Sequence, residues 1–256
     1  MQTTQSGERF MIDIHCHILF GVDDGAKTEE DTIEMLRIAH QDGLKKIIAT
    51  SHCLPGLRYD NETSTLKPVY DRCVQLIKEN QFDIELIFGS ELMATPLSLE
   101  WLKEDRIPTI NNTKWLLLEL PWHSTNMFEL DPDLYLKSVI DLGYKIMIAH
   151  PERYPTVQQD YSLMEKWRHM GCCFQVNRTS FYDDHDLVVR EFAWKILKDG
   201  YCDIIASDAH RHHGSRVNKL SDIYALISAT YGEATAKRMM VDNPQRMIDG
   251  LDLEIS

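Results

Sequence analysis

The sequence predicts an α/β fold built on parallel strands, arranged either as a barrel or as a doubly wound sheet. Three observations support this prediction. Short runs of β-prone apolar residues recur seven times along the chain. Most segments between these runs have the apolar periodicity of helices. Side chains that commonly bind metals follow six of the seven runs, at the strand ends where parallel α/β folds collect their active sites.

The predicted strands are short runs rich in branched aliphatic and aromatic residues. They cover residues 10–14, 46–50, 84–89, 115–120, 144–149, 172–176 and 202–206. No linker, low-complexity segment or repeat interrupts the alternation, so we expect one domain over residues 10–250. Residues 1–9 are expected to form a flexible tail, and residues 250–256 a second one.

The first predicted helix covers residues 28–42. Ile33, Leu36 and Ala39 recur at helical spacing, and acidic residues occupy the first turn, where the helix dipole favours them. Gly43 is a typical residue to end such a helix. Similar patterns predict helices at 65–80, 131–142, 160–170, 184–199 and 217–231.

The composition excludes several classes of protein. Hydrophobic residues make up 43% of the chain and charged residues 26%, as in ordinary globular domains. The apolar runs are too short to span a bilayer, and the N-terminus has no apolar segment of a signal peptide, so we expect no membrane insertion and a cytoplasmic location. The six cysteines form no C-x-x-C pair and are expected to be free thiols.

The balance of 27 basic against 40 acidic residues gives a net charge of −13. Such a surface would on average repel a phosphate backbone, so we expect no nucleic-acid partner. A small phosphate ligand remains compatible with this charge, because bound cations can invert the local field.

Nine imidazole and carboxylate side chains follow the predicted strands. They are His15, His17, Asp24, His52, Glu91, Glu119, His150, Asp208 and His210. Side chains alternate along a strand, so His15 and His17 share one face while Cys16 points away, and Asp208 shares a face with His210. The sixth strand lacks a ligand-type residue and ends in Asn177.

A lone histidine or glutamate at a strand end is more often a cap or a hydrogen-bonded polar group. Nine of them in one place would repel one another without a cation. The set therefore predicts a polynuclear metal centre. Imidazoles and carboxylates without thiolates suit divalent zinc, manganese or iron, and nine ligands suggest two or three ions with a bridging carboxylate.

The ordered motifs resemble the PHP (polymerase and histidinol phosphatase) superfamily. More closely, they resemble the bacterial metal-dependent tyrosine phosphatases of capsule and exopolysaccharide loci. The motifs are MIDIHCHIL at 11–19, GVDDGAKT at 21–28, IATSH at 48–52, GSEL at 89–92, LLEL at 117–120, IAHPERY at 148–154 and ASDAH at 206–210. The resemblance extends over residues 11–250 and implies a distorted, TIM-like (β/α)7 barrel with a trinuclear metal site.

The resemblance also implies how the ligands are divided among the ions. One ion would be held by His15, His17 and Asp208. It would share Glu91 with a second ion, which adds Glu119 and His150. The third would take Asp24, His52 and His210. Manganese is the expected metal, with zinc or iron as alternatives.

The chain departs from the family pattern in two places. Ser51 and Cys53 flank His52, where the family usually has a proline before the histidine and often another histidine after it. After His210 the family usually runs through an asparagine to an arginine followed by proline. In this chain Arg216 corresponds to that arginine by its spacing from His210 in the sequence, and Arg211 is the alternative.

The resemblance and the residues together predict phosphate-ester hydrolysis. A water that bridges two metal ions would supply a hydroxide to attack the phosphorus. Arg153 and Arg216 would bind the phosphoryl oxygens, beside Asp208 and His210 in the catalytic centre. His210 or a metal-bound water could act as the general acid, although a tyrosine leaving group with a pKa near 10 needs less protonation than an alcohol.

By resemblance, the substrate would be a phosphotyrosine protein, namely the C-terminal tail of a bacterial tyrosine kinase that controls polysaccharide export. A small phosphomonoester such as histidinol phosphate is an alternative substrate for the same site. A non-catalytic, metal-stabilised protein that binds a partner is an alternative of another class, disfavoured because structural metal sites need fewer ligands. A homo-oligomer that pairs through helix 28–42 remains open.

A second phosphatase signature competes with the metal site. Cys172, Arg178 and Thr179 match the C-x5-R-[S/T] pattern of cysteine-dependent tyrosine phosphatases. That loop wraps backbone N–H groups around the phosphate and usually needs glycines to do so. The five intervening residues contain no glycine and are predicted to form a buried strand, so we expect no thiol mechanism.

Overall fold

The computed structural model describes residues 10–121, 130–182 and 186–255, and within them nine strands occur. The strands are β1 (Met11–Cys16), β2 (Leu44–Ala49), β3 (His52–Cys53), β4 (Glu85–Phe88), β5 (Glu91–Met93), β6 (Trp115–Glu119), β7 (Lys145–Ala149), β8 (Cys173–Asn177) and β9 (Ile204–Ala206). All paired strands are parallel. They form two sheets, in the orders β1-β2-β4 and β3-β5-β6-β7-β8-β9.

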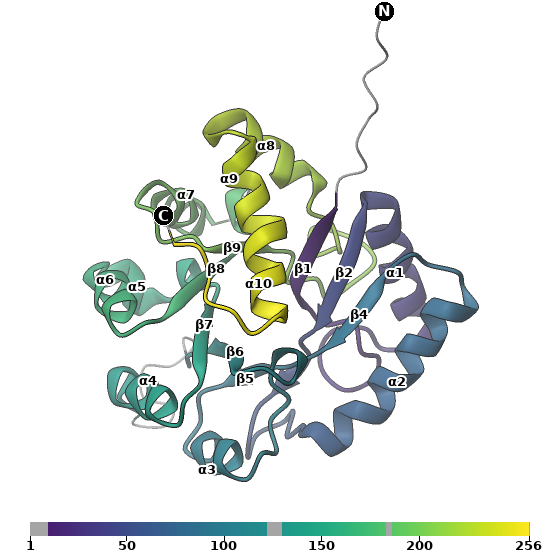
Figure 1. Ribbon diagram of the computed structural model, residues 1–256, viewed down its shortest axis with the longest axis horizontal. Helices are drawn as coiled ribbons and strands as arrows, with labels where there is room; N and C mark the ends of the chain where they lie inside the picture. Colours follow the sequence, from purple (N-terminus) through teal and green to yellow (C-terminus); the bar gives the residue numbers. More distant parts are fainter. Residues whose placement is uncertain (1–9, 122–129, 183–185, 256) are drawn as a thin grey trace, which may run out of the picture.

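Helices connect the strands and surround them. They are α1 (Glu29–Asp42), α2 (Thr63–Glu79), α3 (Ser98–Lys103), α4 (Pro132–Asp141), α5 (Pro155–Gln159), α6 (Ser162–His169), α7 (Leu187–Lys198), α8 (Ser221–Tyr231), α9 (Glu233–Lys237) and α10 (Asn243–Ile248). Shorter helical segments are η1 (Ile110–Asn112), η2 (Pro151–Arg153), η3 (Arg178–Phe181) and η4 (Arg238–Asp242). Figure 1 shows the strands around a common centre, with α1 to α7 on the outside. The predicted distorted barrel is confirmed, and the doubly wound alternative is excluded.

The seven predicted strands correspond to nine because two of them are divided. The second passes from β2 to β3 through Thr50 and Ser51, and the third passes from β4 to β5 through Gly89 and Ser90. In each case the first part pairs in the small sheet and the second part in the large one. Gly89 lies in a tight space, since a Cβ there would be 2.8 Å from Cδ1 of Ile110.

The barrel closes where β1 meets β9. The buried carboxylate of Asp13 accepts hydrogen bonds from the backbone and side chain of Ser207, at 2.9 and 2.5 Å. Beyond the last paired residues, the N–H of Asp208 donates to the carbonyl of His15 at 2.9 Å, and that of His17 donates to the carbonyl of Ala209 at 2.8 Å. These bonds bring the ends of the first and last strands side by side.

The centre of the barrel is filled by apolar side chains, among them Ile12, Leu117 and Met147, which pack with Met247 and Ile248 of α10. In Figure 1, α10 lies across the barrel, and its contacts are with residues near the N-terminal ends of the strands. The C-terminal ends are therefore left for the polar cluster described below.

The segment 250–255 is not the loose tail that the sequence analysis expects. The indole N–H of Trp115 donates to the carbonyl of Leu251 at 2.9 Å, and the side chain of Asn243 donates to the carbonyl of Glu254 at 3.1 Å. Leu253 is buried. The expected tail at residues 1–9 lies outside the described residues.

Helix boundaries follow the local signals closely in α1. Thr28 caps the helix by accepting from the N–H of Asp31, whose side chain accepts in return, and Gly43 ends the helix with a φ of 89°. The helix predicted at 217–231 begins only at Ser221, because Asn218 is buried and donates to Cys16. No described helix is long and apolar enough to cross a membrane.

Candidate metal centre

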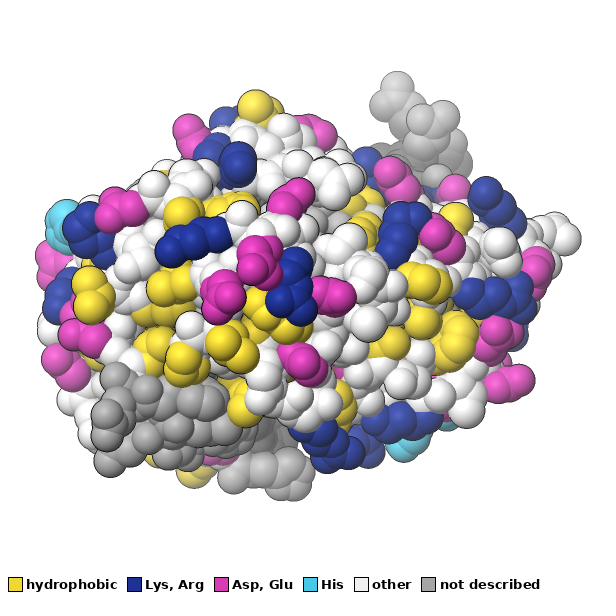
Figure 2. Space-filling model, turned by 90° about the horizontal axis from the view of Figure 1, so that it is seen from below, with side chains coloured by type: hydrophobic (Ala, Val, Ile, Leu, Met, Phe, Trp, Pro, Cys, Tyr) yellow, Lys and Arg dark blue, Asp and Glu magenta, His cyan; other side chains and the backbone are white. Residues whose placement is uncertain are grey.

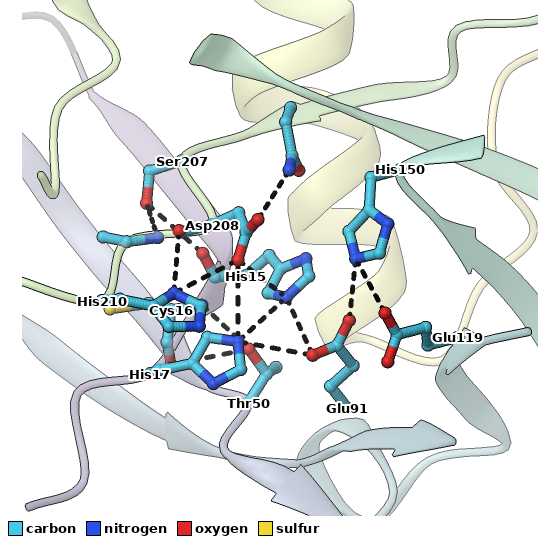
Figure 3. A network of polar contacts seen from close by, with 12 residues as sticks. His15, Cys16, His17, Thr50, Glu91, Glu119, His150, Ser207, Asp208 and His210 are labelled. Atoms are coloured by element: carbon cyan, nitrogen blue, oxygen red, sulfur yellow. Dashed lines mark hydrogen bonds and ion pairs between the residues drawn. The ribbon is translucent and has the colours of Figure 1, made fainter. Parts of the chain in front are cut away.

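The nine predicted ligands lie together at the C-terminal ends of the strands, as Figure 3 shows for seven of them. His15 lies near the end of β1, Glu91 is the first residue of β5 and Glu119 is the last residue of β6. His150 and Asp208 follow β7 and β9. A cavity of about 110 Å³ opens over this cluster. It is lined by Asp24, His52, Glu91, Glu119, His150, Arg153, Asp208, His210 and Arg216. His15 and His17 are fully buried beside it.

The potential ligand atoms fall into four overlapping sets, within each of which all atoms lie within 4.8 Å of one another. The sets are His15 with His17 and Asp208; His17 with Asp24, His52 and His210; His15 with Glu91 and His150; and His52 with Glu91 and Glu119. Glu91 belongs to two of them and contacts four of the imidazoles, at 3.0 to 3.4 Å. A carboxylate so placed can bridge two ions.

Two buried histidines direct lone pairs at the same point. Nδ1 of His15 lies 2.9 Å from Oε1 of Gln175, and Nδ1 of His17 lies 2.8 Å from Oδ2 of Asp23. An oxygen acceptor requires the proton on Nδ1, so each neutral ring has its lone pair on Nε2. The two Nε2 atoms are 3.3 Å apart. Both also lie 3.3 to 3.6 Å from carboxylate oxygens of Glu91 and Asp208.

This convergence of electron pairs fits a divalent cation. Among the described residues, Oδ1 of Asp24 and Nδ1 of His52 are also buried without a well-aligned hydrogen bond, although they lie 3.3 Å from Nε2 of His210 and 3.0 Å from Oε2 of Glu91 respectively. Buried polar atoms are rarely left in this state. Nitrogen and carboxylate donors without thiolates suit zinc, manganese or iron.

A chain of two amides fixes the proton position on His15. The carboxylate of Asp208 accepts from the amide NH2 of Asn177 at 2.6 Å, and the amide oxygen of Asn177 accepts from Gln175 at 2.7 Å. The oxygen of Gln175 is thereby turned toward His15. Gln175 and Asn177 are fully buried on β8 and define the amide relay between Asp208 and His15.

The cluster has a strong negative field. Burial lowers the pKa of His52, but Glu91 outweighs this and raises it to about 10. In the same way, Glu91 and Asp208 raise the pKa of His15 to about 9 against the effect of burial. His210 is the exception, because burial and His17 lower its pKa to about 4. A field that holds protons on buried imidazoles also attracts metal cations.

Two of the predicted ligands have a strained backbone. His150 has a φ of 37° and Asp208 a φ of 51°, in the left-handed region that L-residues rarely adopt. The bond from the N–H of Asp208 to His15 stabilises one of these turns, and that from the N–H of Arg153 to the carbonyl of His150, at 3.0 Å, stabilises the other. Such strain is typical of functional sites.

Both predicted arginines reach Asp208. Nη2 of Arg216 donates to Oδ1 of Asp208 at 2.7 Å, and Nη1 of Arg153 lies 3.5 Å from Oδ2. Both line the cavity over the metal-type ligands. Arg211, the rival of Arg216, lines a neighbouring cavity instead.

Asp23, Gln175 and Asn177 orient the potential ligands, a role that was not predicted for them from the sequence. Asp23 accepts from His17 and from the backbone N–H of His52, at 2.8 and 2.9 Å. A signal was present in β8, where Gln175 and Asn177 occupy alternate positions as His15 and His17 do in β1. Polar side chains on an inward-facing strand surface need partners.

The cysteine signature does not form a phosphate loop. Cys172 is buried, and burial raises its pKa to about 12. Arg178 is engaged by Asp222 through two hydrogen bonds of 2.9 and 2.6 Å, and it donates to the carbonyl of Ser215 at 3.0 Å. The arginine of the pattern therefore holds α8 rather than a phosphate.

Comparisons with known proteins agree on one family. The family model described as capsular polysaccharide synthesis, CpsB/CapC, matches residues 11–249. The tyrosine-protein phosphatase CpsB of Streptococcus pneumoniae is 30% identical over 243 residues, which cover 93% of this chain and 98% of that protein.

Solved structures have the same fold. A chain from the crystal structures of YwqE from Bacillus subtilis and CpsB from Streptococcus pneumoniae, described as unique metal-dependent tyrosine phosphatases, superposes with a TM-score of 0.86. It is 25% identical, and the match covers 96% of this chain and 97% of that chain. Histidinol phosphate phosphatase of Lactococcus lactis has a TM-score of 0.54 at 16% identity, over 89% of this chain and 94% of its own, a likeness of fold alone.

Proposed function

Because this chain belongs to the CpsB/CapC family of capsular polysaccharide synthesis, we infer that its cluster of imidazoles and carboxylates hydrolyses phosphotyrosine. The chain is a metal-dependent protein-tyrosine phosphatase, and its substrates are phosphotyrosine proteins. The observation that carries this function is the convergence of seven ligand-type side chains with Arg153 and Arg216 on one cavity, with the ligand-type His15 and His17 buried beside it.

We propose that the cluster holds two or three divalent ions. Manganese is the expected metal, and zinc or iron are the alternatives. The division of ligands among the ions is the one that the resemblance to the family implies. His15, His17 and Asp208 would serve one ion, Glu119 and His150 a second, and Asp24, His52 and His210 a third, with Glu91 shared. When bound, such ions acidify water and neutralise phosphoryl charge.

Arg153 and Arg216 would bind the phosphoryl oxygens of the substrate. Both guanidinium groups already lie against the carboxylate of Asp208, at the wall of the cavity. A phosphate bound there can accept two parallel hydrogen bonds from an arginine. The arginines would thereby orient the phosphoryl group over the cluster and stabilise charge as it develops.

We propose that His210 acts as a ligand rather than as the general acid. Nδ1 of His210 lies 3.1 Å from the carbonyl of Asp208, an acceptor that requires the ring proton on Nδ1. Nε2 then presents a lone pair, and Nη2 of Arg216, a donor, lies 3.2 Å from it. Burial and His17 also lower the pKa of this ring. A tyrosine phenolate, with a pKa near 10, can leave without a strong acid.

The natural substrate we propose is the tyrosine-rich C-terminal tail of a bacterial tyrosine kinase that controls capsule or exopolysaccharide export. The enzyme would act on this tail in the cytoplasm. The chemistry of the cavity supports this, because its lining is polar and would engage mainly the phosphate. A flexible tail can present such a group to a shallow site.

The test is a metal titration of the stripped enzyme. Manganese, zinc and iron are added back separately, and hydrolysis of a phosphotyrosine peptide is compared with that of histidinol phosphate. Restored activity with preference for the peptide is expected. Preference for the small ester would contradict the substrate, and activity that survives chelation but is lost with iodoacetamide would move the chemistry to Cys172.

A further inference from the structure

A second cavity of about 190 Å³ adjoins the candidate metal centre. Lys27 and Asp31 line it on one side, and the segment of Arg211, His212 and His213 lines it on the other. His210 lines both this cavity and the one over the ligand cluster, so the two are contiguous. We call the second one the Arg211 cavity.

The Arg211 cavity is rich in cationic and hydrogen-bond-donating groups. Of the residues that the structure describes, Asp31 is the only carboxylate in its lining. This carboxylate is already occupied, because it accepts from the backbone N–H groups of Lys27 and Thr28, at 3.0 and 3.2 Å, and lies 3.3 Å from Nδ1 of His212. Lys27 and Arg211 are two permanent cations against this one carboxylate, so the lining has an excess of one positive charge. The ammonium of Lys27 also donates to the carbonyl of Asp23 at 2.7 Å.

Arg211 is available to a ligand. Its side chain is exposed and makes no hydrogen bond or ion pair with any residue that the structure describes. Arg178 and Arg216, in contrast, are each held by a carboxylate. On the face shown in Figure 2, basic and acidic side chains lie interspersed.

The Arg211 cavity is lined by the segment that follows the ligand-type residue His210. Arg211, His212 and His213 stand between His210 and Arg216 in the sequence. The chain thus places a basic tripeptide at the wall that the two cavities share.

We propose that the Arg211 cavity is an anion subsite, which binds a carboxylate or a second phosphate on the same peptide as the phosphotyrosine being hydrolysed. The inference rests on the proposed function and adds a substrate preference to it. Arginine binds either anion through two parallel hydrogen bonds, and the histidine N–H groups and the ammonium of Lys27 supply further donors.

The experiment uses three phosphotyrosine peptides of one length, with neutral flanks, with acidic flanks, or with a second phosphotyrosine nearby. The metal-loaded full chain is assayed at low ionic strength. We expect kcat/KM to be about fivefold higher for the two anionic peptides, since an exposed ion pair contributes up to about 1 kcal/mol. The ratio should fall as salt is added.

Two substitutions locate the effect. Arg211→Gln should remove the preference, and Arg211→Glu should reverse it. Lys198→Gln is the matched control, because it makes the same change in net charge at an exposed position on α7. Anisotropy titrations with peptides that carry a non-hydrolysable phosphonate should show the same ratios in Kd.

The outcomes are distinct. Equal kcat/KM for the three peptides, or a preference that persists in Arg211→Gln, overturns the subsite and leaves the phosphatase intact. A preference for the doubly phosphorylated peptide alone identifies a second phosphate as the ligand, whereas a preference for both identifies anions in general. Failure to hydrolyse even the neutral peptide would overturn the proposed function, and the subsite with it.

Discussion

Nη2 of Arg216 donates to Oδ1 of Asp208 at 2.7 Å, and the same oxygen lies 3.5 Å from Nε2 of His15. The second oxygen of Asp208 accepts from Asn177 and faces Arg153. Burial raises the pKa of Asp208, but Arg216 and His15 outweigh this and hold it well below its usual range. This carboxylate is therefore where the arginines and the ligand-type imidazoles meet.

Replacing Asp208 tests this arrangement directly. Asp208→Asn keeps the shape of the side chain but removes the charge that a cation and two arginines would share. We expect kcat/KM to fall by more than about 100-fold, beyond the loss typical of a residue that only supports a ligand. His150→Ala should abolish turnover as well. The far-UV circular dichroism should be unchanged, and Asp249→Asn, at an exposed position after α10, should behave as wild type.

Arg153 is expected to bind the phosphoryl group. Arg153→Ala should lower kcat/KM for a phosphotyrosine peptide by more than about tenfold, because a bidentate hydrogen bond to phosphate is lost. Arg153→Lys should recover only part of this loss, since the charge returns without the planar pair of donors. Steady-state kinetics and the inhibition constant of inorganic phosphate measure both variants. A wild-type value for Arg153→Ala would remove this residue from the phosphate site.

The amide relay should control metal affinity. Gln175→Leu removes the acceptor that keeps the proton of His15 on Nδ1, and it also releases the amide of Asn177. We expect metal affinity to fall by about tenfold to 100-fold, as for other groups that orient metal-ligating histidines. Competition with a chelator gives the affinity without reference to activity. Gln245→Leu, on α10, is the control, and equal affinities of the two variants would contradict the role of the relay.

The Arg178–Asp222 pair gives a prediction for stability as a function of pH. Burial favours the protonated acid, but hydrogen bonds from Arg178 outweigh it and lower the pKa of Asp222 below its usual 3.8. A lowered pKa contributes stability above 3.8 that is lost as the pH falls through the folded-state value. Asp222→Asn should therefore lower the free energy of unfolding by about 1 kcal/mol from pH 5 to 8.

Urea unfolding of wild type and Asp222→Asn at several pH values provides the measurement. The difference in unfolding free energy should be constant near neutrality and shrink below about pH 4, as wild-type Asp222 becomes protonated. A difference that grows on acidification would contradict the assigned sign. Catalysis should be little affected at pH 7, because neither residue lines the cavity over the ligand cluster.

The position of the site could be predicted from the sequence because strand geometry is simple. Side chains alternate along a strand, so His15 and His17 share one face, as do Asp208 and His210. Parallel strands end on one side of the sheet, so the two pairs are expected to lie close together. The alternation of strands and helices was equally readable, since apolar periodicity differs between the two.

The remainder depended on long-range contacts that leave weak local signals. Thr50 and Gly89 do not reveal that the strands they follow change sheets. The sequence does not distinguish Asp23, which supports His17, from Asp24, which lines the cavity. The late start of α8 follows from the burial of Asn218 against Cys16, a contact between residues far apart in sequence.

The pairing of the ends of β1 and β9 determines when the ligand cluster can be completed during synthesis and folding of the chain. Asp13 and Ser207, which join these strands, are 194 residues apart in the sequence. His15 and His17 emerge early in synthesis, and Asp208 and His210 emerge near its end. Contacts between such distant segments require closure of a long loop, whose entropy cost slows folding. A nascent chain therefore carries only a fraction of the ligands, and high-affinity capture of ions must wait until the ring of strands is complete.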